Sequence, residues 1–82
     1  MKTRKKEYGV YNIIGKNAER LRKEKGIKQK DFVAQMQSMG VDINPTSYSK
    51  LEGQLRFATD KEVYAIARVL GVTTDSLFEK SE

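Results

Sequence analysis

The stretch NPTSYSKLEG, residues 44–53, concentrates small polar side chains at the start of a short predicted helix. The Thr46 hydroxyl can bond a base edge or a phosphate, its methyl group can meet a thymine methyl, and Lys50 can reach a guanine edge or a phosphate. Tyr48 and Leu51 are three residues apart and can face a core. A helix with small polar groups at its head and apolar groups at its rear is suited to insertion into the major groove of DNA.

The elements that must position this stretch are all predicted to be helices. Asn44 can cap the predicted helix, and Pro45 suits its first position, where no intrahelical hydrogen bond is lost. Thr59 and Glu62 form a capping box that opens a later helix. We therefore expect one compact all-α domain of five helices joined by short turns and one longer link at 40–43. The predicted helices are 13–25, ended by Gly26; 29–39, ended by Gly40; 45–52, ended by Gly53; one after Thr59, ended by Gly71; and a short one capped by Thr73 or Thr74 that contains Leu77 and Phe78.

Each longer helix carries apolar residues at helical spacing, which predicts one buried face per helix. A chain of 82 residues supports one small core. The residues expected in that core are Ile14, Ala18 and Leu21; Phe32, Val33, Met36 and Met39; Tyr48 and Leu51; and Val63, Ile66, Ala67 and Leu70.

The composition excludes several classes of site. The chain has no cysteine and no histidine, so disulfides and Cys/His metal sites are excluded. Acid–base work would fall on carboxylates, tyrosine or lysine, and no paired set suggests a catalytic cleft, so we expect neither an enzyme nor a cofactor or small-molecule ligand. Neither a membrane span nor a signal-peptide core is present, and we expect a soluble, cytoplasmic protein.

The net charge of +5 is unevenly distributed along the chain. Residues 1–30 contain 11 of the 16 basic and 3 of the 11 acidic residues, a local charge of +8, whereas residues 31–82 carry −3. This asymmetry indicates a polyanionic partner, although a merely solvated lysine-rich surface has the same signature. Residues 1–9 are expected to form a flexible basic arm, which either follows DNA or only raises general affinity, and residues 10–82 the folded domain.

Three segments follow one another over about residues 13–78: RLRKEKGIKQKDFVAQM, NPTSYSKLEG and TDKEVYAIARVLGVTTDSLF. In their order and spacing they resemble the lambda-repressor-like, Xre-type helix-turn-helix family. The resemblance implies a compact five-helix lambda-repressor-like domain with the helix-turn-helix at its second and third helices. It also implies a sequence-specific regulator of transcription that binds double-stranded DNA, with repression as the expected mode and a homodimer at least on DNA.

The resemblance assigns roles to individual residues. Gln29 would bind a phosphate and brace the head of the third helix, and Lys28 would stand beside the DNA backbone. Arg22 and Glu52 would form a buried or half-buried salt bridge that fixes the third helix without touching DNA. Arg56, in the loop after that helix, would contact a phosphate, as would Asn44, while Pro45, Thr46 and Lys50 would face the bases. The full set of candidate DNA-contacting residues is Lys28, Gln29, Asn44, Pro45, Thr46, Ser49, Lys50 and Arg56.

Three features depart from the family pattern. The link between the second and third helices is longer than the usual tight turn, which leaves the relative position of these helices open. Gln54 stands where the family commonly has glycine, and Pro45 cannot donate a hydrogen bond to a base. A protein-interaction module, such as an antitoxin or a co-regulator subunit, is the alternative function, since it would use the same fold and the acidic C-terminal half. The last helix, around Leu77 and Phe78, is the expected self-contact.

Overall fold

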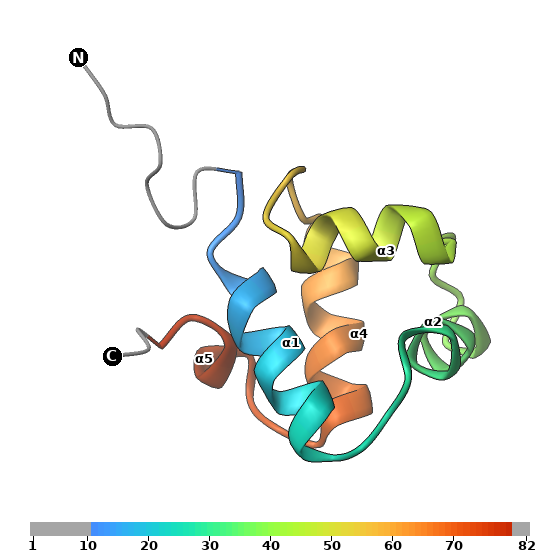
Figure 1. Ribbon diagram of the computed structural model, residues 1–82, viewed down its shortest axis with the longest axis horizontal. Coiled ribbons are helices and arrows are strands. Elements are labelled where there is room, and N and C mark those ends of the chain that lie inside the picture. Colours follow the sequence, from blue (N-terminus) through green and yellow to red (C-terminus); the bar gives the residue numbers. More distant parts are fainter. Residues whose placement is uncertain (1–10, 80–82) are drawn as a thin grey trace.

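The computed structural model describes residues 11–79, and the regular elements of this part of the chain are all helices. Helix α3 lies across one end of the α1–α4 pair, α2 packs against α3 and α4, and α5 packs against α1 and α4 (Figure 1). The described chain is thus a compact all-α unit, as predicted, and the expected basic arm, 1–9, lies outside it. The helices are α1 (Ile14–Glu24), α2 (Gln29–Ser38), α3 (Pro45–Glu52), α4 (Asp60–Leu70) and α5 (Thr74–Leu77).

The helix boundaries follow the capping signals in the sequence. The Asn44 side chain accepts a hydrogen bond from the Ser47 backbone N–H at 2.8 Å, and Pro45 occupies the first turn of α3. Both hydrogen bonds of the capping box between Thr59 and Glu62 are present at the start of α4. These boundaries are therefore set locally, by side chains within three residues of the groups that they satisfy.

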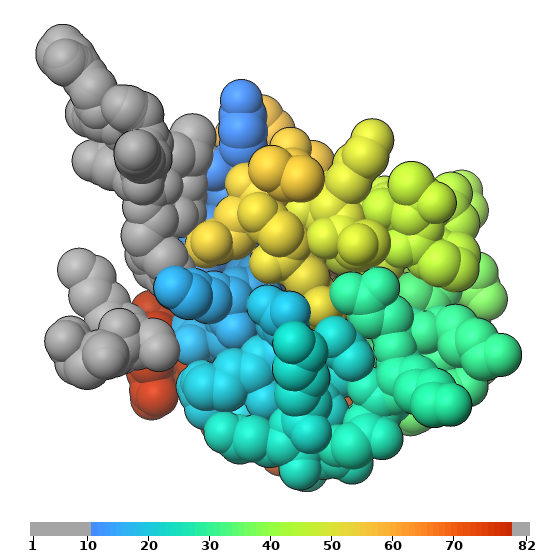
Figure 2. All heavy atoms as spheres, viewed as in Figure 1, coloured from blue at the N-terminus to red at the C-terminus, as the bar shows by residue number. Residues whose placement is uncertain are grey.

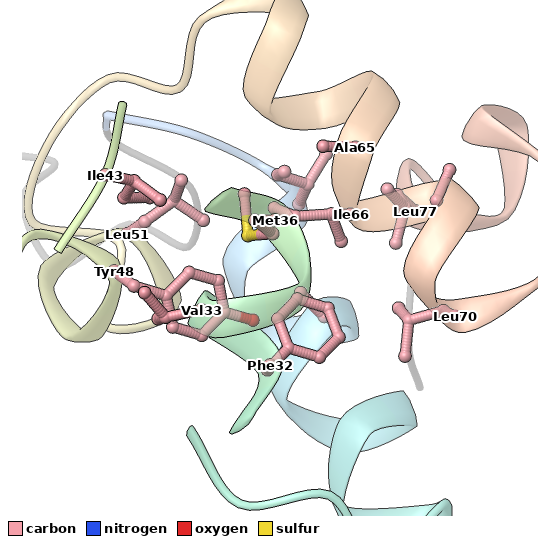
Figure 3. Close-up of a cluster of buried hydrophobic side chains, with 13 residues drawn as sticks. Phe32, Val33, Met36, Ile43, Tyr48, Leu51, Ala65, Ile66, Leu70 and Leu77 are labelled. Atoms are coloured by element: carbon pink, nitrogen blue, oxygen red, sulfur yellow. The ribbon is translucent and has the colours of Figure 1, made fainter. Parts of the chain in front are cut away.

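A single core fills the space between the helices (Figure 3). The rings of Phe32 and Tyr48 join α2 to α3, with their centroids 5.2 Å apart. Met36, Leu51 and Ile66 are also completely buried. The other buried apolar residues are Ile14, Ala18, Val33, Ile43, Ala65, Ala67, Leu70 and Leu77, with Leu21 and Val63 partly buried at the edge.

Two apolar residues expected in buried or helical positions lie elsewhere. Met39 is 41% exposed, because α2 ends at Ser38 and the following residue no longer continues its buried face. Phe78 is 48% exposed and follows the last residue of α5 instead of lying inside that helix. Of the two proposed caps for α5, Thr73 is the one that accepts a hydrogen bond from a backbone N–H in the first turn. The exposed Phe78 contributes to a surface described below.

The long link between α2 and α3 folds back onto α2. The Val41 backbone N–H donates to the Met36 carbonyl at 3.2 Å, and the Gln37 side chain donates to the Ile43 carbonyl at 2.7 Å. Ile43 itself is buried in the core. The added residues therefore leave α2 and α3 in direct contact, and the longer link does not move the two helices apart.

The end of α3 differs from the prediction in one detail. Gly53 ends the helix, but its backbone stays in the right-handed region with φ −78°, and Gln54 takes the left-handed conformation with φ +62°. That conformation costs a residue with a side chain roughly 1–2 kcal/mol. The Gln54 amide donates to the Asn12 carbonyl at 3.1 Å, a hydrogen bond that offsets part of this cost.

Candidate nucleic-acid interface

Helix α3 has a buried rear and an exposed front. Tyr48 and Leu51 are completely buried at its rear. Thr46, Ser49 and Lys50 are exposed to solvent, as are Asn44 and Pro45 at the helix head. The atoms of α3 form an exposed band along one edge of the molecule, next to those of α2 (Figure 2). Its polar side chains are thus accessible to a ligand as large as a DNA duplex.

A shallow hollow lies beside the head of α3 and brings together most of the predicted base-facing and phosphate-facing residues. Leu55, which sequence reasoning missed, adds an apolar wall to this hollow and is 66% exposed. A leucine in this place can meet a thymine methyl in the way that other apolar side chains do. Ser49, Lys28 and Gln29 do not line the hollow. Its lining residues are Asn44, Pro45, Thr46, Ser47, Lys50, Leu55 and Arg56.

The Arg56 side chain forms hydrogen bonds within the protein. Its guanidinium donates two hydrogen bonds to the Glu62 carboxylate, both at 2.9 Å, and a third to the Ser47 carbonyl at 3.0 Å. Burial opposes ionisation of Glu62, but the hydrogen bonds from Arg56 and Thr59 outweigh it and hold the pKa of Glu62 below its ordinary value. Arg56 therefore links the first turn of α3 to the start of α4. Its contact with a phosphate stays a prediction.

A buried polar network fixes the opposite end of α3. The Arg22 guanidinium donates to both carboxylate oxygens of Glu52, at 2.7 and 3.1 Å, and the two side chains are 8% and 3% exposed. Arg22 also donates to the Ile27 carbonyl at 2.7 Å, and the Gln29 amide donates to Glu52 at 2.9 Å. The hydrogen bond to Glu52 raises the pKa of Arg22 above its ordinary value in spite of burial. Gln29 therefore braces the C-terminal end of α3, and not its head as expected. Its contact with a phosphate stays a prediction.

Helix α1 approaches the last turn of α3 very closely at Gly15. A β-carbon added at this residue would lie 2.3 Å from the Leu51 carbonyl oxygen and 2.9 Å from that of Glu52. Asn12 reinforces the approach, since its side chain donates to the carbonyls of Leu51 and Arg56 at 3.0 and 2.7 Å and accepts from the Gly15 N–H at 2.8 Å. Sequence reasoning missed both residues, because their partners on α3 and in the loop after it are 36 or more positions away in the chain.

The Tyr48 hydroxyl is buried next to this network. It makes no hydrogen bond within residues 11–79, although it lies close enough to Glu52 to feel the carboxylate charge. Burial and this negative charge both raise the pKa of Tyr48 well above its ordinary value. The phenol is therefore neutral at physiological pH, and the charge of the network is confined to Arg22 and Glu52.

The positive charge near α1 and α2 is partly neutralised. Lys23 pairs with Glu19 at 3.1 Å, as its helical spacing predicts, and Arg20 pairs with Glu24 at 3.3 Å. The lysines around the α1–α2 turn, by contrast, make no ion pair with residues 11–79. The exposed lysines that make no ion pair with the described part of the chain include Lys25, Lys28, Lys30 and Lys50.

The free lysines lie near groups that favour anions. Lys28 immediately precedes the first turn of α2, whose backbone N–H groups have no intrahelical partner and favour an anion. Atoms of the α1–α2 turn and of α3 are exposed on the same face of the molecule (Figure 2). This face can therefore contact the phosphates of both DNA strands, on either side of the DNA groove that α3 would enter.

Metal-ligand clusters and membrane-spanning helices were sought in the part of the chain from 11 to 79, and none was found. This part contains no group of three or more acidic side chains placed to hold a metal ion. None of its helices combines the length and the apolar character needed to cross a bilayer. Comparisons with protein-family models, with curated proteins and with solved structures found no match to this chain. The functional interpretation therefore depends on the residues and their geometry.

Proposed function

We propose that this protein is a sequence-specific, double-stranded DNA-binding transcriptional regulator of the lambda-repressor-like, Xre helix-turn-helix type, which inserts α3 into the major groove. The observation that carries the proposal is the asymmetry of α3. Its rear and its C-terminal end are buried and hydrogen-bonded, while Thr46 and Lys50 at its front are exposed without an internal partner in the described chain. A rigidly held helix with a free polar front is what base readout requires.

Recognition divides into phosphate contacts and base contacts. Lys28, the first turn of α2 and the free lysines around the α1–α2 turn bind phosphates and set the register of the protein on the duplex. Thr46, Lys50 and Leu55 read base edges and methyl groups in the groove. The Arg22–Glu52 pair touches no DNA and fixes the angle at which α3 enters. With about 4–6 phosphate contacts per copy, the logarithm of the binding constant falls against the logarithm of salt concentration with a slope of roughly −4 to −5.

Selectivity calls for two copies. A single module of this kind buries only about 600–1,000 Å² of its surface on DNA, which limits the number of bases that it can read. Two copies on a two-fold symmetric site double the number of base contacts, and their half-sites lie about 34 Å apart, one turn of the duplex. We therefore expect the preferred DNA to be palindromic and the bound species to be a homodimer.

The test is selection from a randomised duplex pool, followed by anisotropy titrations over a series of salt concentrations. Thr46→Ala/Lys50→Ala is expected to lose the selected preference and to keep weak, salt-dependent binding, because each good base contact contributes about 1–3 kcal/mol of discrimination. The matched control is Lys61→Ala/Thr74→Ala, which removes the same chemical groups from exposed positions on α4 and α5. This control is expected to bind like the wild type.

The contrary result points to the second candidate function. If no motif is selected and both double variants bind DNA alike, α3 does not read DNA, and a partner-binding module becomes the better account. A hollow between the end of α2 and the start of α4 favours that role, since Met39 and Tyr64 line it and are 41% and 57% exposed. A protein partner would then be expected to protect these two side chains from solvent.

A further inference from the structure

A second exposed surface lies beside the C-terminal end of α3, away from the helix head. We call it the aromatic patch and define it as Tyr11, Ile13, Phe57 and Phe78. The rings of Tyr11 and Phe57 meet edge to face with their centroids 5.5 Å apart. An open groove next to the Tyr11 ring has Tyr11, Ile13, Phe78 and the partly buried Val63 of α4 among its lining residues. The patch thus combines three segments that are distant in the sequence.

The patch is large for a protein of this size. Tyr11 is 47%, Phe57 71% and Phe78 48% exposed. With about 150–250 Å² for a whole aromatic side chain, these three rings expose roughly 250–400 Å² together. Apolar patches of about 300–600 Å² are the largest that a monomer usually carries, and they often serve a function. The apolar area therefore calls for an occupant.

We propose that the aromatic patch is the surface through which two copies of this chain contact each other. The choice of a second copy rests on the proposed function, because reading a two-fold DNA site requires two copies. A symmetric contact would bury roughly 500–800 Å² of aromatic surface, less than the about 1,200 Å² of stable interfaces. The contact is therefore weak in solution and becomes effective when DNA holds two copies at a high local concentration.

The charges of the molecule favour this surface over the others. Arg56, next to Phe57 in the chain, is neutralised by its ion pair with Glu62. The face that carries Lys25, Lys28 and Lys30 would instead repel an identical face on a second copy, since these lysines have no acidic partner in residues 11–79. A self-contact through the aromatic patch leaves that basic face free for phosphates.

The position of the patch also fits two heads of α3 on one DNA face. Asn12 joins the patch segment to the last turn of α3 through its hydrogen bond to the Leu51 carbonyl, and the segment that leads into α1 lies beyond that end of the helix (Figure 1). With eight residues, α3 is about 12 Å long. Two such lengths and a packing distance of about 10 Å between them bring the two heads close to the spacing of about 34 Å between half-sites.

The experiment measures self-association by sedimentation equilibrium up to about 1 mM protein without DNA, and then cooperativity of binding on the selected duplex. Phe57→Ser and Phe78→Ser are the test variants, and both change exposed rings, so that circular dichroism should show an intact fold. Tyr64→Ser is the matched control, since it removes an aromatic ring of similar exposure, 57%, from a different surface. We expect weak association of the wild type and of Tyr64→Ser, and association at least about tenfold weaker in both test variants.

The outcomes separate the two proposals. A wild type that stays monomeric without DNA and binds its DNA site without cooperativity would overturn the patch contact, as would an equal loss of association in Tyr64→Ser. If a DNA motif is selected but Phe57→Ser binds it as cooperatively as the wild type, the proposed function stands and the patch contact fails. If no motif is selected while Phe57→Ser and Phe78→Ser still weaken the dimer selectively, the patch contact stands and the proposed function fails.

Discussion

The two ends of α3 are held in different ways. At its C-terminal end, Glu52 is buried and receives three side-chain hydrogen bonds, and the α1 backbone at Gly15 is in close contact with the last two carbonyls. At its head, Asn44 provides a local cap, and Arg56 reaches the Ser47 carbonyl. The C-terminal end is thus fixed by interactions across the whole chain, whereas the head depends on a cap and one ion pair.

This difference shows how a small helical protein can hold a short helix in place and still expose part of it to a ligand. Two turns of helix are not stable alone, since isolated helices shorter than about 12–15 residues are marginal in water. A buried anchor at one end supplies the stability, so that the other end can carry side chains chosen for a ligand. We therefore expect substitutions at the C-terminal end of α3 to reduce stability most, and substitutions of the exposed side chains Thr46 and Lys50 at its front to change binding with little effect on folding.

Removal of one partner of the buried ion pair is expected to have the largest effect. Arg22→Met leaves the Glu52 carboxylate buried without its cation, which typically costs about 3–5 kcal/mol in the free energy of unfolding. Lys23→Met, one residue away, breaks a surface pair whose side chains are 65% and 42% exposed, and we expect a loss of no more than about 0.5 kcal/mol. Urea unfolding monitored by circular dichroism measures both changes. Equal losses of stability in the two variants would contradict a special role of the buried Arg22–Glu52 pair.

A second variant tests the close approach of α1 to α3. Gly15→Ala is expected to cost about 2–3 kcal/mol, because the new methyl group meets two backbone carbonyls that can move only with the helix. Gly53→Ala is the control, since its β-carbon would lie 3.4 Å from the nearest atom and its φ of −78° suits alanine. Its effect should stay within about 1 kcal/mol in the same unfolding measurement. If Gly15→Ala leaves the free energy of unfolding unchanged, the α1 and α3 backbones are not in close contact at this residue.

The ion pair at the head of α3 predicts a pH dependence of stability. Because the pKa of Glu62 is lower in the folded chain than the about 4.3 of an unfolded glutamate, the unfolded state binds more protons in this range. The stabilisation is therefore complete above about pH 5 and is lost as the pH falls through the folded-state pKa.

Glu62→Gln removes this titration. We expect it to lower the free energy of unfolding at pH 7 by about 1–3 kcal/mol, the contribution of hydrogen bonds to a charged group, and to flatten the decline toward pH 3. Arg56→Gln removes the pair from the other side and should flatten the curve in the same way. Thermal melts between pH 3 and pH 7 measure both, and a curve parallel to that of the wild type would exclude a role for this pair.

The smallest effects on stability are expected at the helix head. Asn44→Ala removes the cap of α3 and should cost about 1 kcal/mol. Thr46→Ala/Lys50→Ala changes only exposed groups and should alter the free energy of unfolding by no more than about 0.5 kcal/mol, while it removes the DNA preference. A large loss of stability in this double variant would mean that the head carries structure as well as binding, and the contrast between the two ends would then disappear.

Local rules predicted most of the fold from the sequence. The periodic apolar residues placed Phe32, Tyr48 and Ile66 in the core, and the capping residues placed the starts of α3 and α4. The prediction failed for Met39, because a helix end that shifts by one residue takes the next side chain off the buried face. Resemblance to a family suggested the Arg22–Glu52 pair, which no local pattern in this sequence indicates.

The candidate site was predictable only in part, because helical periodicity applies to residues inside α3 and not to those in the loop that follows it. Thr46 and Lys50 are exposed because they share a helix with Tyr48 and Leu51, and helical spacing alone assigns the two pairs to different faces. Leu55 lies beyond the helix, where no periodicity applies, and its place in the hollow depends on the path of the loop.

The sequence by itself therefore determined the helices, their caps and their buried faces, since each of these depends on residues within a few positions of one another. It also determined the uneven distribution of charge, which is a matter of composition alone. Only the tertiary structure decided which polar groups are already occupied. In the folded chain Arg56 is hydrogen-bonded to Glu62, Gln29 to Glu52, and Asn12 to the end of α3. Such choices depend on which partners packing brings within hydrogen-bond distance, and in the last two cases these partners are 23 and 39 positions apart in the chain.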